Sequence, residues 1–454
     1  MRNLRRAQFG GIAGRGYRWT EMWLLVLPSA FMLVGLLTLL LVPTVNDLAT
    51  PVAHHNLPPL DAFTPAFGLI AALVGAHLLL TIIAPDADQT ILPLAGTLSS
   101  VGVIMSLRLG PDLNQPALGT KQLVWVIIGL VFCIATVKAT QDLRWIRNFK
   151  YTWAAVGIAL VGVTLVRAHS FSTSAPSRDV LSIGPGGLSF QPSEILKICL
   201  VVFFAGYLSE NREMLASASY RLGPLRLPPV KHLGPLIAML GIALLIFVGV
   251  RELGLAILIF GLFLSMLYVA SNRPMYVVVS ILIFALGAFV LYQIFPYARA
   301  RVAIVGNAFD PNVALDQGYQ IVQGLIAFGT GGVFGSGLGL GKPYVVPASN
   351  TDYIAASFGE EFGFAGVLAV FGLFMLLVYR GMHIAVNARD SFNQLMAVGL
   401  TAVFALQTLV ILAGNLKIMP LTGVPLPFVA YGGSSVIANF IIIGLMIRLS
   451  QRNT

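Results

Sequence analysis

Long runs of apolar residues dominate this sequence and constrain its fold more than any other feature. Twelve runs of membrane length fall near residues 22–43, 65–84, 91–108, 122–140, 152–167, 192–208, 234–250, 252–271, 275–295, 359–379, 393–414 and 430–448. In lipid, backbone polar groups must be satisfied within the segment, so each run predicts a helix. Only 10% of the residues are charged, far fewer than in soluble domains. The sequence therefore predicts an all-α polytopic membrane protein with about twelve transmembrane helices.

The basic residues predict how these helices are oriented. Twelve spans place both termini on one side, and Lys and Arg gather in cytoplasmic loops. With the termini cytoplasmic, the inner segments hold most of the 28 basic residues. We therefore expect a multi-pass membrane protein with both termini cytoplasmic. The excess of positive charge needs no nucleic-acid partner. The short inner segment 85–90 is an exception, because it carries Asp86 and Asp88 and no base.

The segment 296–358 stands out because it is the longest stretch without a membrane-length apolar run. The predicted orientation places it outside, and a connection of this length is a candidate site. Nine glycines fall between Gly318 and Gly341. Irregular backbone at membrane depth is tolerated only where protein buries it or where it lines a cavity. We therefore expect residues 318–341 to re-enter the outer leaflet as the wall of a groove.

Ionisable residues inside apolar runs form the next group of candidates. Each costs about 2.5–3.5 kcal/mol to insert, so it is by default a functional candidate. The run QPSEILK carries Gln191, Ser193, Glu194 and Lys197, and the two charges share a helix face at a spacing of three. An ion pair that only fixes packing explains these two charges as well as a substrate site does. Arg251 and Glu252 lie at a tight turn between two spans, where a charged turn at the membrane interface is the alternative to a functional role. For Ser434 and Ser435, close helix packing is the alternative.

Cysteine and histidine residues give little support for a metal or disulfide site. Cys133 and Cys199 each lie inside an apolar run, so two buried thiols are expected. His54 and His55 are interpreted as surface histidines.

Six stretches, read in order, resemble the shape, elongation, division and sporulation (SEDS) family, the FtsW/RodA/SpoVE type of peptidoglycan glycosyltransferase. They are KQLVWVIIGL, LSFQPSEILK, RELGLAILI, DQGYQIVQGLIAFGTGGVFGSGLGLG, NTDYIAASFGEEFGFAG and PLTGVPLPFVAYGGSSVIANF. The resemblance covers roughly residues 90–450. It implies a core at 91–454, preceded at 1–90 by a basic segment and two extra spans.

The resemblance implies an activity and partners. Family members polymerise lipid II on the outer face of the membrane, and undecaprenyl diphosphate leaves. They usually work beside a class B penicillin-binding transpeptidase. A divalent cation, Mg²⁺ or Mn²⁺, could assist at the diphosphate. The roles implied are elongation, division or sporulation, which the sequence does not distinguish.

The resemblance also implies an essential acid a few residues before Gly-Tyr-Gln, and this chain departs from the pattern there. Tyr319 and Gln320 match, but Val313 stands where the acid is expected, six residues before the tyrosine. The nearest acids are Asp316 and Asp310. We expect Asp316 to be the general base, and Asp310, which precedes a proline, to be a turn residue.

Further candidates for binding the substrate follow from charge. A diphosphate leaving group needs cations, and Arg299, Arg301, Lys342, Arg251 and Lys197 are expected on or near the outer face. Asp352, Glu360 and Glu361 are expected where the tenth span begins, where capping of the helix is an alternative role. A non-catalytic scaffold of a cell-wall complex and a lipid flippase or transporter remain alternative functions.

Overall fold

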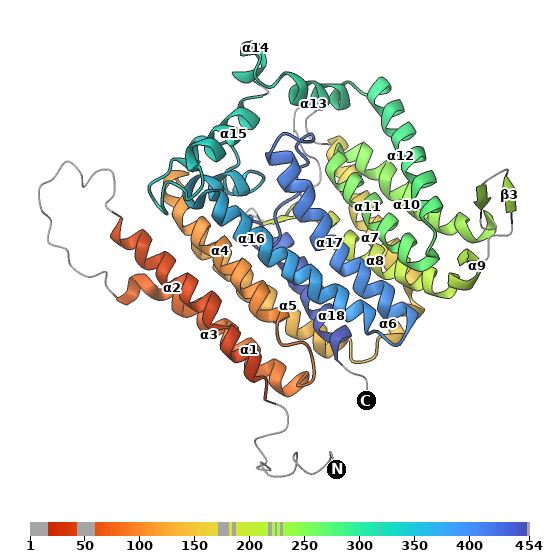
Figure 1. The fold of residues 1–454 in the computed structure, drawn as a ribbon, viewed down its shortest axis with the longest axis horizontal. Coiled ribbons are helices and arrows are strands. Elements are labelled where there is room, and N and C mark those ends of the chain that lie inside the picture. The colour runs from red at the N-terminus through yellow and green to blue at the C-terminus, as the bar shows by residue number, and fades with distance from the viewer. Residues whose placement is uncertain are drawn as a thin grey trace, which may run out of the picture.

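The structure is a computed structural model that describes residues 17–42, 60–170, 181–183, 188–216, 220–222, 225–227, 230–316 and 318–451. His54 and His55 lie outside the described residues. The fold is a bundle of helices, as predicted (Figure 1). The helices are α1 (Trp19–Leu24), α2 (Val26–Leu41), α3 (Thr64–Ile83), α4 (Ile91–Asp112), α5 (Leu118–Ala139), α6 (Arg144–Asn148), α7 (Lys150–Ser170), α8 (Pro192–Glu210), α9 (Arg212–Ala216), α10 (Val230–Val250), α11 (Leu253–Ser271), α12 (Pro274–Ile294), α13 (Pro296–Asn307), α14 (Pro311–Ala314), α15 (Tyr319–Gly331), α16 (Ile354–Val386), α17 (Ser391–Asn415) and α18 (Gly433–Ser450).

Short elements complete the described chain. Two 3₁₀ helices occupy Leu60–Phe63 and Pro343–Val345. Two antiparallel hairpins pair β1 (Leu181–Ile183) with β2 (Leu188–Phe190), and β3 (Tyr220–Leu222) with β4 (Leu225–Leu227). These hairpins connect helices and do not alter the helical class.

Every predicted apolar run coincides with a helix. Within the described residues, ten helical segments are long and apolar enough to cross a membrane, with α1 and α2 together forming the first. The described apolar parts of α7 and α10 are shorter, Lys150–Thr164 and Gly234–Val250. The protein is therefore a multi-pass membrane protein, while the count of twelve spans stays a prediction.

The helices differ in depth within the bundle. Helix α8 is buried along most of its length, whereas only Tyr276 is buried on α12.

Small residues let helices approach closely, as expected for packing in lipid. A Cβ at Gly157 would lie 2.8 Å from Leu196 Cδ1, and one at Gly444 would lie 2.6 Å from the carbonyl oxygen of Cys133. Both cysteines are free and buried, as predicted.

The long segment 296–358 is mostly helical. Pro296 and Pro311 occupy the first turns of α13 and α14, where their missing N–H groups cost nothing. A second hydrophobic cluster joins α13, α15 and the chain before α16, through Ala308, Ile321, Ala327, Val346, Tyr353 and Ala356. Helices α13, α14 and α15 form a cap at one end of the bundle, which this cluster packs against the chain before α16 (Figure 1).

Helix α16 departs from the predicted boundaries. It begins at Ile354, five residues before the predicted start, and is broken at Gly363, where φ is 69° and ψ is −171°. Glu360 and Glu361 consequently lie at the end of a short first helix and not at the mouth of the span. Only glycine adopts this conformation readily, which explains the break.

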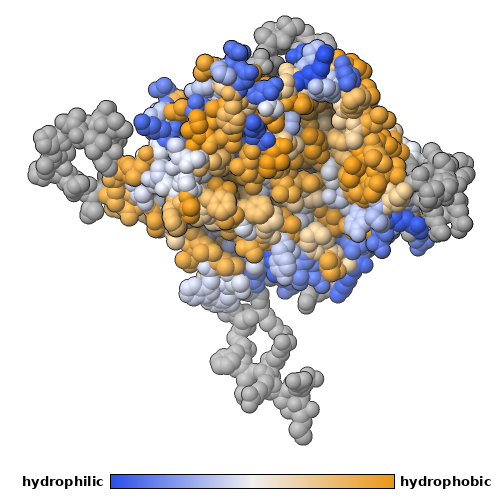
Figure 2. All heavy atoms as spheres, turned by 45° about the horizontal axis from the view of Figure 1, so that its top comes forward, coloured by the Kyte–Doolittle hydropathy of each residue, from blue (hydrophilic) through white to orange (hydrophobic). Residues whose placement is uncertain are grey.

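The surface has a hydrophobic band between two polar edges. Figure 2 shows hydrophobic residues across the middle of one face, with hydrophilic residues above and below. Helices α13–α15 lie at one end of the bundle, and α1, α6 and the end of α18 lie at the other (Figure 1). This division matches a protein that crosses a bilayer.

Candidate functional site

Three segments that are far apart in sequence meet in the half of the bundle that carries α13–α15. They are the start of α8, the turn between α10 and α11, and the irregular segment 416–432. Lys197 Nζ lies 2.9 Å from Glu194 Oε2 and donates to Gln407 Oε1 at 3.0 Å. Gln407 Nε2 in turn donates to the carbonyl oxygen of Pro425 at 2.8 Å. A chain of polar contacts thus runs from α8 through α17 to this segment.

The Glu194–Lys197 pair is a buried structural link. The predicted pairing on one helix face is confirmed, and both side chains are fully buried. Glu194 and Gln407 engage two of the three N–H donors of the Lys197 ammonium group, and its role at a diphosphate stays a prediction. Buried charges require such partners, since desolvation penalises them strongly.

The neighbouring polar residues of QPS and GGSS also contact each other. Ser434 Oγ accepts a hydrogen bond from the backbone N–H of Gln191 at 3.2 Å. Ser435 is buried and accepts from Asn439 Nδ2 within α18. Ser193 is fully buried at the first turn of α8. Ser434 therefore joins the start of α8 to α18, which agrees with the packing alternative for the GGSS run.

The turn between α10 and α11 closes the site on a second side. Arg251 has a φ of 66°, and its guanidinium lies 5.8 Å from the centre of the Tyr297 ring. Glu252 is 3% exposed and precedes α11. A Cβ at Gly254 would overlap Thr422, at 2.2 Å from its Cβ, so only glycine allows segment 416–432 to pack here.

A large groove opens beside this junction. Its volume is about 1010 Å³, and α10, α11, α12 and α13 form its walls together with residues 420–422. Its lining is mainly Leu, Ile, Val and Phe. Arg301 and Thr422 are among the few polar residues that line it. Arg301 Nη1 donates to the carbonyl oxygen of Leu421 at 3.3 Å. The groove thus combines an apolar wall with a fixed positive charge.

Several polar atoms near Arg301 have no partner among the described residues. They are the hydroxyl groups of Tyr353 and Thr422 and Oδ1 of Asn415, all buried. Asn415 Nδ2 donates to the carbonyl oxygen of Asp352 at 2.8 Å. Burial raises the pKa of the Asp352 carboxyl, and the nearby Arg301 opposes that rise. Polar groups left unsatisfied in this way are where a ligand's hydroxyl groups could bind.

Glu360 and Glu361 hold the glycine-rich loop, defined here as residues 332–341. Glu360 Oε1 accepts from the N–H of Lys342 at 2.9 Å, and Glu361 Oε2 accepts from the N–H of Gly339 at 3.1 Å. Arg108 donates from Nε to Glu361 Oε1 at 2.7 Å and from Nη2 to the carbonyl oxygen of Gly341 at 2.8 Å. The capping interpretation is therefore wrong, because the carboxylates bind loop N–H groups beside the break in α16.

Backbone hydrogen bonds insert this loop into the break at Gly363. The N–H groups of Phe364 and Ala365 donate to the carbonyl oxygens of Gly332 and Val333, at 2.9 and 3.0 Å. The N–H groups of Ser336 and Gly337 donate to the carbonyl oxygens of Glu360 and Glu361. The glycines are needed because the backbones approach closely: a Cβ at Gly335 would lie 2.1 Å from the oxygen of Glu361. The first part of the predicted re-entrant segment is helix α15, and its second part is this loop.

The two acids on either side of α14, Asp310 and Asp316, differ in their surroundings. Asp310 is the N-cap of α14 and accepts the N–H of Asn312 at 2.9 Å, which confirms its prediction as a turn residue. Asp316 is exposed in the turn between α14 and α15. Among the described residues, no hydrogen bond or ion pair joins its carboxylate to the groove. Three further predicted residues lie in the same cap. Arg299 is exposed on α13, and Tyr319 begins α15. Gln320 donates from Nε2 to the carbonyl oxygen of Pro347.

Four polar residues at the site were not among the residues predicted from the sequence. They are Arg108, Gln407, Asn415 and Thr422. Arg108 ends a predicted apolar run, and Gln407 and Asn415 lie inside another. Their polarity within these runs was the available signal. Only the fold brings Arg108 to Glu361, Gln407 to Lys197 and Asn415 to Asp352.

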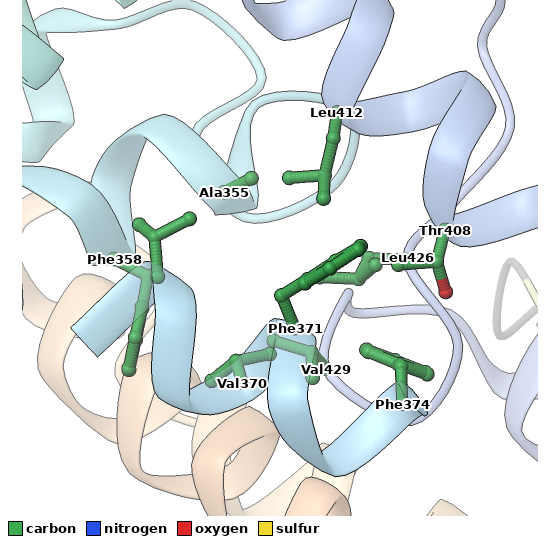
Figure 3. Close-up of a pocket in the computed structure, with 10 residues that line it drawn as sticks. Ala355, Phe358, Val370, Phe371, Phe374, Thr408, Leu412, Leu426 and Val429 are labelled. Atoms are coloured by element: carbon green, nitrogen blue, oxygen red, sulfur yellow. The ribbon is translucent and has the colours of Figure 1, made fainter. Parts of the chain in front are cut away.

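A second cavity is too small to serve as a site. It lies between α16, α17 and residues 426–429 and measures about 10 Å³, roughly the space of one water molecule. Figure 3 shows that phenylalanine, leucine and valine side chains surround it, with Thr408 at its edge. We interpret it as a packing gap.

Comparisons with known proteins agree with these motifs. The model of the FtsW/RodA/SpoVE cell cycle protein family matches residues 88–454. The chain therefore belongs to this family. It is similar to the peptidoglycan glycosyltransferase RodA of Mycobacterium tuberculosis, with 34% identity over 401 residues that cover 87% of this chain and 84% of that protein.

Two solved structures share the fold. A chain from a peptidoglycan synthase complex, whose title concerns the coordination of polymerization and crosslinking, has a TM-score of 0.64 at 22% identity and covers 80% of this chain and 97% of that chain. The rod shape determining protein RodA of Thermus thermophilus has a TM-score of 0.56 at 20% identity and covers 81% and 98%. The proposed division at residue 90 stays a prediction; the family match begins at residue 88.

Proposed function

We propose that this protein is a peptidoglycan glycosyltransferase that polymerises lipid II at the outer face of the bacterial inner membrane. The observation that carries the proposal is the apolar groove of about 1010 Å³ with Arg301 on its lining. Such a groove suits the hydrocarbon tail of a lipid-linked sugar, and a guanidinium suits its diphosphate. Membership of the family and the names of its relatives support the same activity.

The reaction requires one proton transfer. A hydroxyl of the acceptor sugar attacks the anomeric carbon of the donor, a new C–O bond forms, and the bond to the diphosphate breaks. The diphosphate leaves with the electron pair, and a carboxylate accepts the hydroxyl proton. We propose Asp316 as this base because it stands shortly before Gly-Tyr-Gln. Asp352 is a second candidate because its carboxyl is partly buried, has a raised pKa and lies near Arg301.

Arg301 is the cation that this proposal places against the leaving group. Arg251 and Arg299 are proposed to assist from the adjoining turn and from the exposed face of α13, together with Lys342. The unpartnered hydroxyl group of Thr422, which lines the groove, is proposed to bind sugar or phosphate oxygens. Lys197 and Glu194 act indirectly, by holding segment 416–432 in place.

A divalent cation remains a proposal of its own. Within the described residues, no group of three or more His, Cys, Asp or Glu side chains could hold a metal ion. Mg²⁺ is often bound by one or two carboxylates together with substrate phosphates. Such an ion would therefore depend on the diphosphate, and no step of the reaction is routed through it here. Chelation with EDTA followed by addition of Mg²⁺ or Mn²⁺ tests the requirement.

The orientation and the partner are also proposals. The end of the bundle opposite α13–α15 carries Arg144, Arg147 and Arg212. Because basic residues gather on the cytoplasmic side, this position supports cytoplasmic termini. A class B penicillin-binding transpeptidase is the proposed partner, because the growing glycan must be cross-linked. Copurification of such a transpeptidase with the full chain tests this partner.

The decisive experiment incubates the purified protein with lipid II and separates the products on a gel. We expect glycan polymers. Absence of polymer, alone or with an added transpeptidase, would favour the scaffold alternative. Transfer of labelled lipid across a vesicle bilayer without polymer would instead identify a flippase.

A further inference from the structure

The N-terminal helices α1–α3 precede the family match and pack tightly on the core. Met32 and Leu36 of α2 and Leu69 and Leu73 of α3 are buried against it. A Cβ at Gly35 would lie 3.1 Å from Ile104 Cδ1 on α4. Figure 1 shows α2 and α3 running beside α4 and α5. These helices are therefore an integral layer of the bundle.

A buried polar cluster fixes the inner end of this layer. Arg18 donates to the carbonyl oxygens of Ala84 and Asp88, both at 2.8 Å, and pairs with Glu21. Glu21 Oε1 also lies 2.8 Å from His77 Nδ1. Arg18 and Glu21 are fully buried.

The acid-bearing segment 85–90 continues this attachment into the core. Asp88 pairs with Arg380 near the end of α16, and its N–H donates to Ser450 Oγ at 2.9 Å. The pairing with Arg380 accounts for Asp88 in a segment that carries no base of its own. These contacts of Asp88 also tie the N-terminal layer to both α16 and α18.

The outer end of α2 reaches the glycine-rich loop. Val42 Cγ2 lies 3.3 Å from the position of a Cβ on Gly339, the residue whose N–H binds Glu361. Midway along α2, the Phe31 ring lies 6.3 Å from the ring of Phe362, which stacks on Phe358 at 4.4 Å. Phe362 immediately precedes the break at Gly363. The N-terminal layer therefore contacts both the glycine-rich loop and the part of α16 that precedes the break at Gly363.

We propose that the N-terminal helices position the glycine-rich loop for glycan synthesis, with Val42 and Phe31 as the positioning residues. The layer is anchored at its inner end and presses on the loop at its outer end. It thereby limits the loop's motion against Glu361 and Arg108. The effect on polymerisation rests on the function proposed above, whereas the effect on loop motion does not.

A disulfide tests the contact directly. The Cβ of Val42 lies 3.5 Å from the Cβ position of Gly339, within the range that disulfides adopt. In the full chain, Val42→Cys with Gly339→Cys should cross-link on mild oxidation, measured by loss of two alkylatable thiols. The control pair is Val34→Cys with Gly339→Cys, because Val34 is 63% exposed on α2. This pair should not cross-link. Equal cross-linking of both pairs, or of neither, would overturn the contact.

Loop motion and kinetics test the positioning role. Phe31→Ala and Val42→Ala should speed hydrogen exchange in residues 332–341 and lower kcat by about 10- to 100-fold, as misplacement of a site by about 1 Å can do. Phe67→Ala and Val34→Ala remove lipid-facing side chains of the same types and should change neither. In the Phe31→Ala variant that carries both cysteines, oxidation of the Val42–Gly339 pair should slow exchange and raise kcat relative to the same protein when reduced. Comparing the two redox forms of one protein removes the strain of a cysteine at Gly339, whose φ is 91°, from the comparison.

Two outcomes would count against the proposal. Unchanged exchange in both Phe31→Ala and Val42→Ala would show that the helices serve only as a membrane anchor. A loss of kcat that the cross-link does not restore would assign the residues to general stability. If the parent protein makes no polymer, the proposed function fails, while the exchange and cross-linking results still decide the positioning role.

Discussion

Asp310 and Asp316 lie close in sequence, but their carboxylates have different surroundings. Asp310 is occupied as the N-cap of α14, and Asp316 is exposed without a described partner. An exposed carboxylate can approach a bound sugar only if the cap of α13–α15 or the substrate brings the two together. Substitution of each carboxylate therefore tests which of them is the base.

We predict that Asp316→Asn abolishes detectable glycan synthesis without altering expression or melting temperature. Loss of a general base typically lowers the rate about 100- to 10,000-fold. Asp310→Asn, the matched control, should have a milder effect through the geometry of the turn. Near-normal polymerisation by purified Asp316→Asn would remove the assignment, and an inactive Asp352→Asn would then transfer it to Asp352.

Asp352 also predicts a pH dependence of stability. Its folded pKa is raised above the ordinary value of 3.8 by burial, so the folded state holds its proton more tightly than the unfolded state. The free energy of unfolding must then fall as pH rises from 3.8 through the folded pKa, and this contribution is constant on either side. Asp352→Asn should flatten that fall in thermal unfolding measured across the window. An unchanged profile, equal to that of the exposed control Asp310→Asn, would contradict the prediction.

At the scale of elements, buried polar links hold the irregular outer segments against the helices. Helix α8 reaches segment 416–432 through Lys197 and Gln407, and α4 reaches the glycine-rich loop through Arg108 and Glu361. Neither segment has regular hydrogen bonding of its own. In a membrane protein such a segment persists only where neighbouring protein satisfies its polar groups.

We predict that Glu194→Ala and Lys197→Ala each lower the yield of folded protein or its activity. Removing one member of a buried pair leaves an uncompensated charge, which costs about 3–5 kcal/mol. The double variant should cost less than the sum of the two, because it leaves neither charge behind. Strict additivity of the unfolding free energies in this cycle would show that the pair is not coupled.

At the scale of the whole molecule, the two ends of the bundle have different roles. The end with α13–α15 carries the groove, Arg301 and the glycine-rich loop, whereas the opposite end carries the basic segments and the cluster around Arg18. A polymerase that receives lipid-linked sugars outside the cell requires the first end to face outward. The distribution of Lys and Arg supports that orientation.

Labelling in intact cells tests this orientation. Cysteines introduced singly at residues 330 and 220 should react differently with an impermeant thiol reagent, with labelling at 330 only. The native Cys133 and Cys199 are buried and provide an unlabelled background. Labelling at 220 but not at 330 would refute the proposed topology.

The sequence by itself determined the helical class, the positions of the apolar helices, the family motifs and the pairing of Glu194 with Lys197. These features depend on local composition and on spacing along one helix, which the chain order specifies. Only the tertiary structure joined Arg108 to Glu361, Lys197 to Gln407 and Val42 to Gly339. It also showed that Glu360 and Glu361 bind a loop instead of capping a helix, because α16 begins earlier, at Ile354, and places them at the end of its first part. Contacts between distant segments depend on how the helices pack, and no single stretch of sequence records that packing.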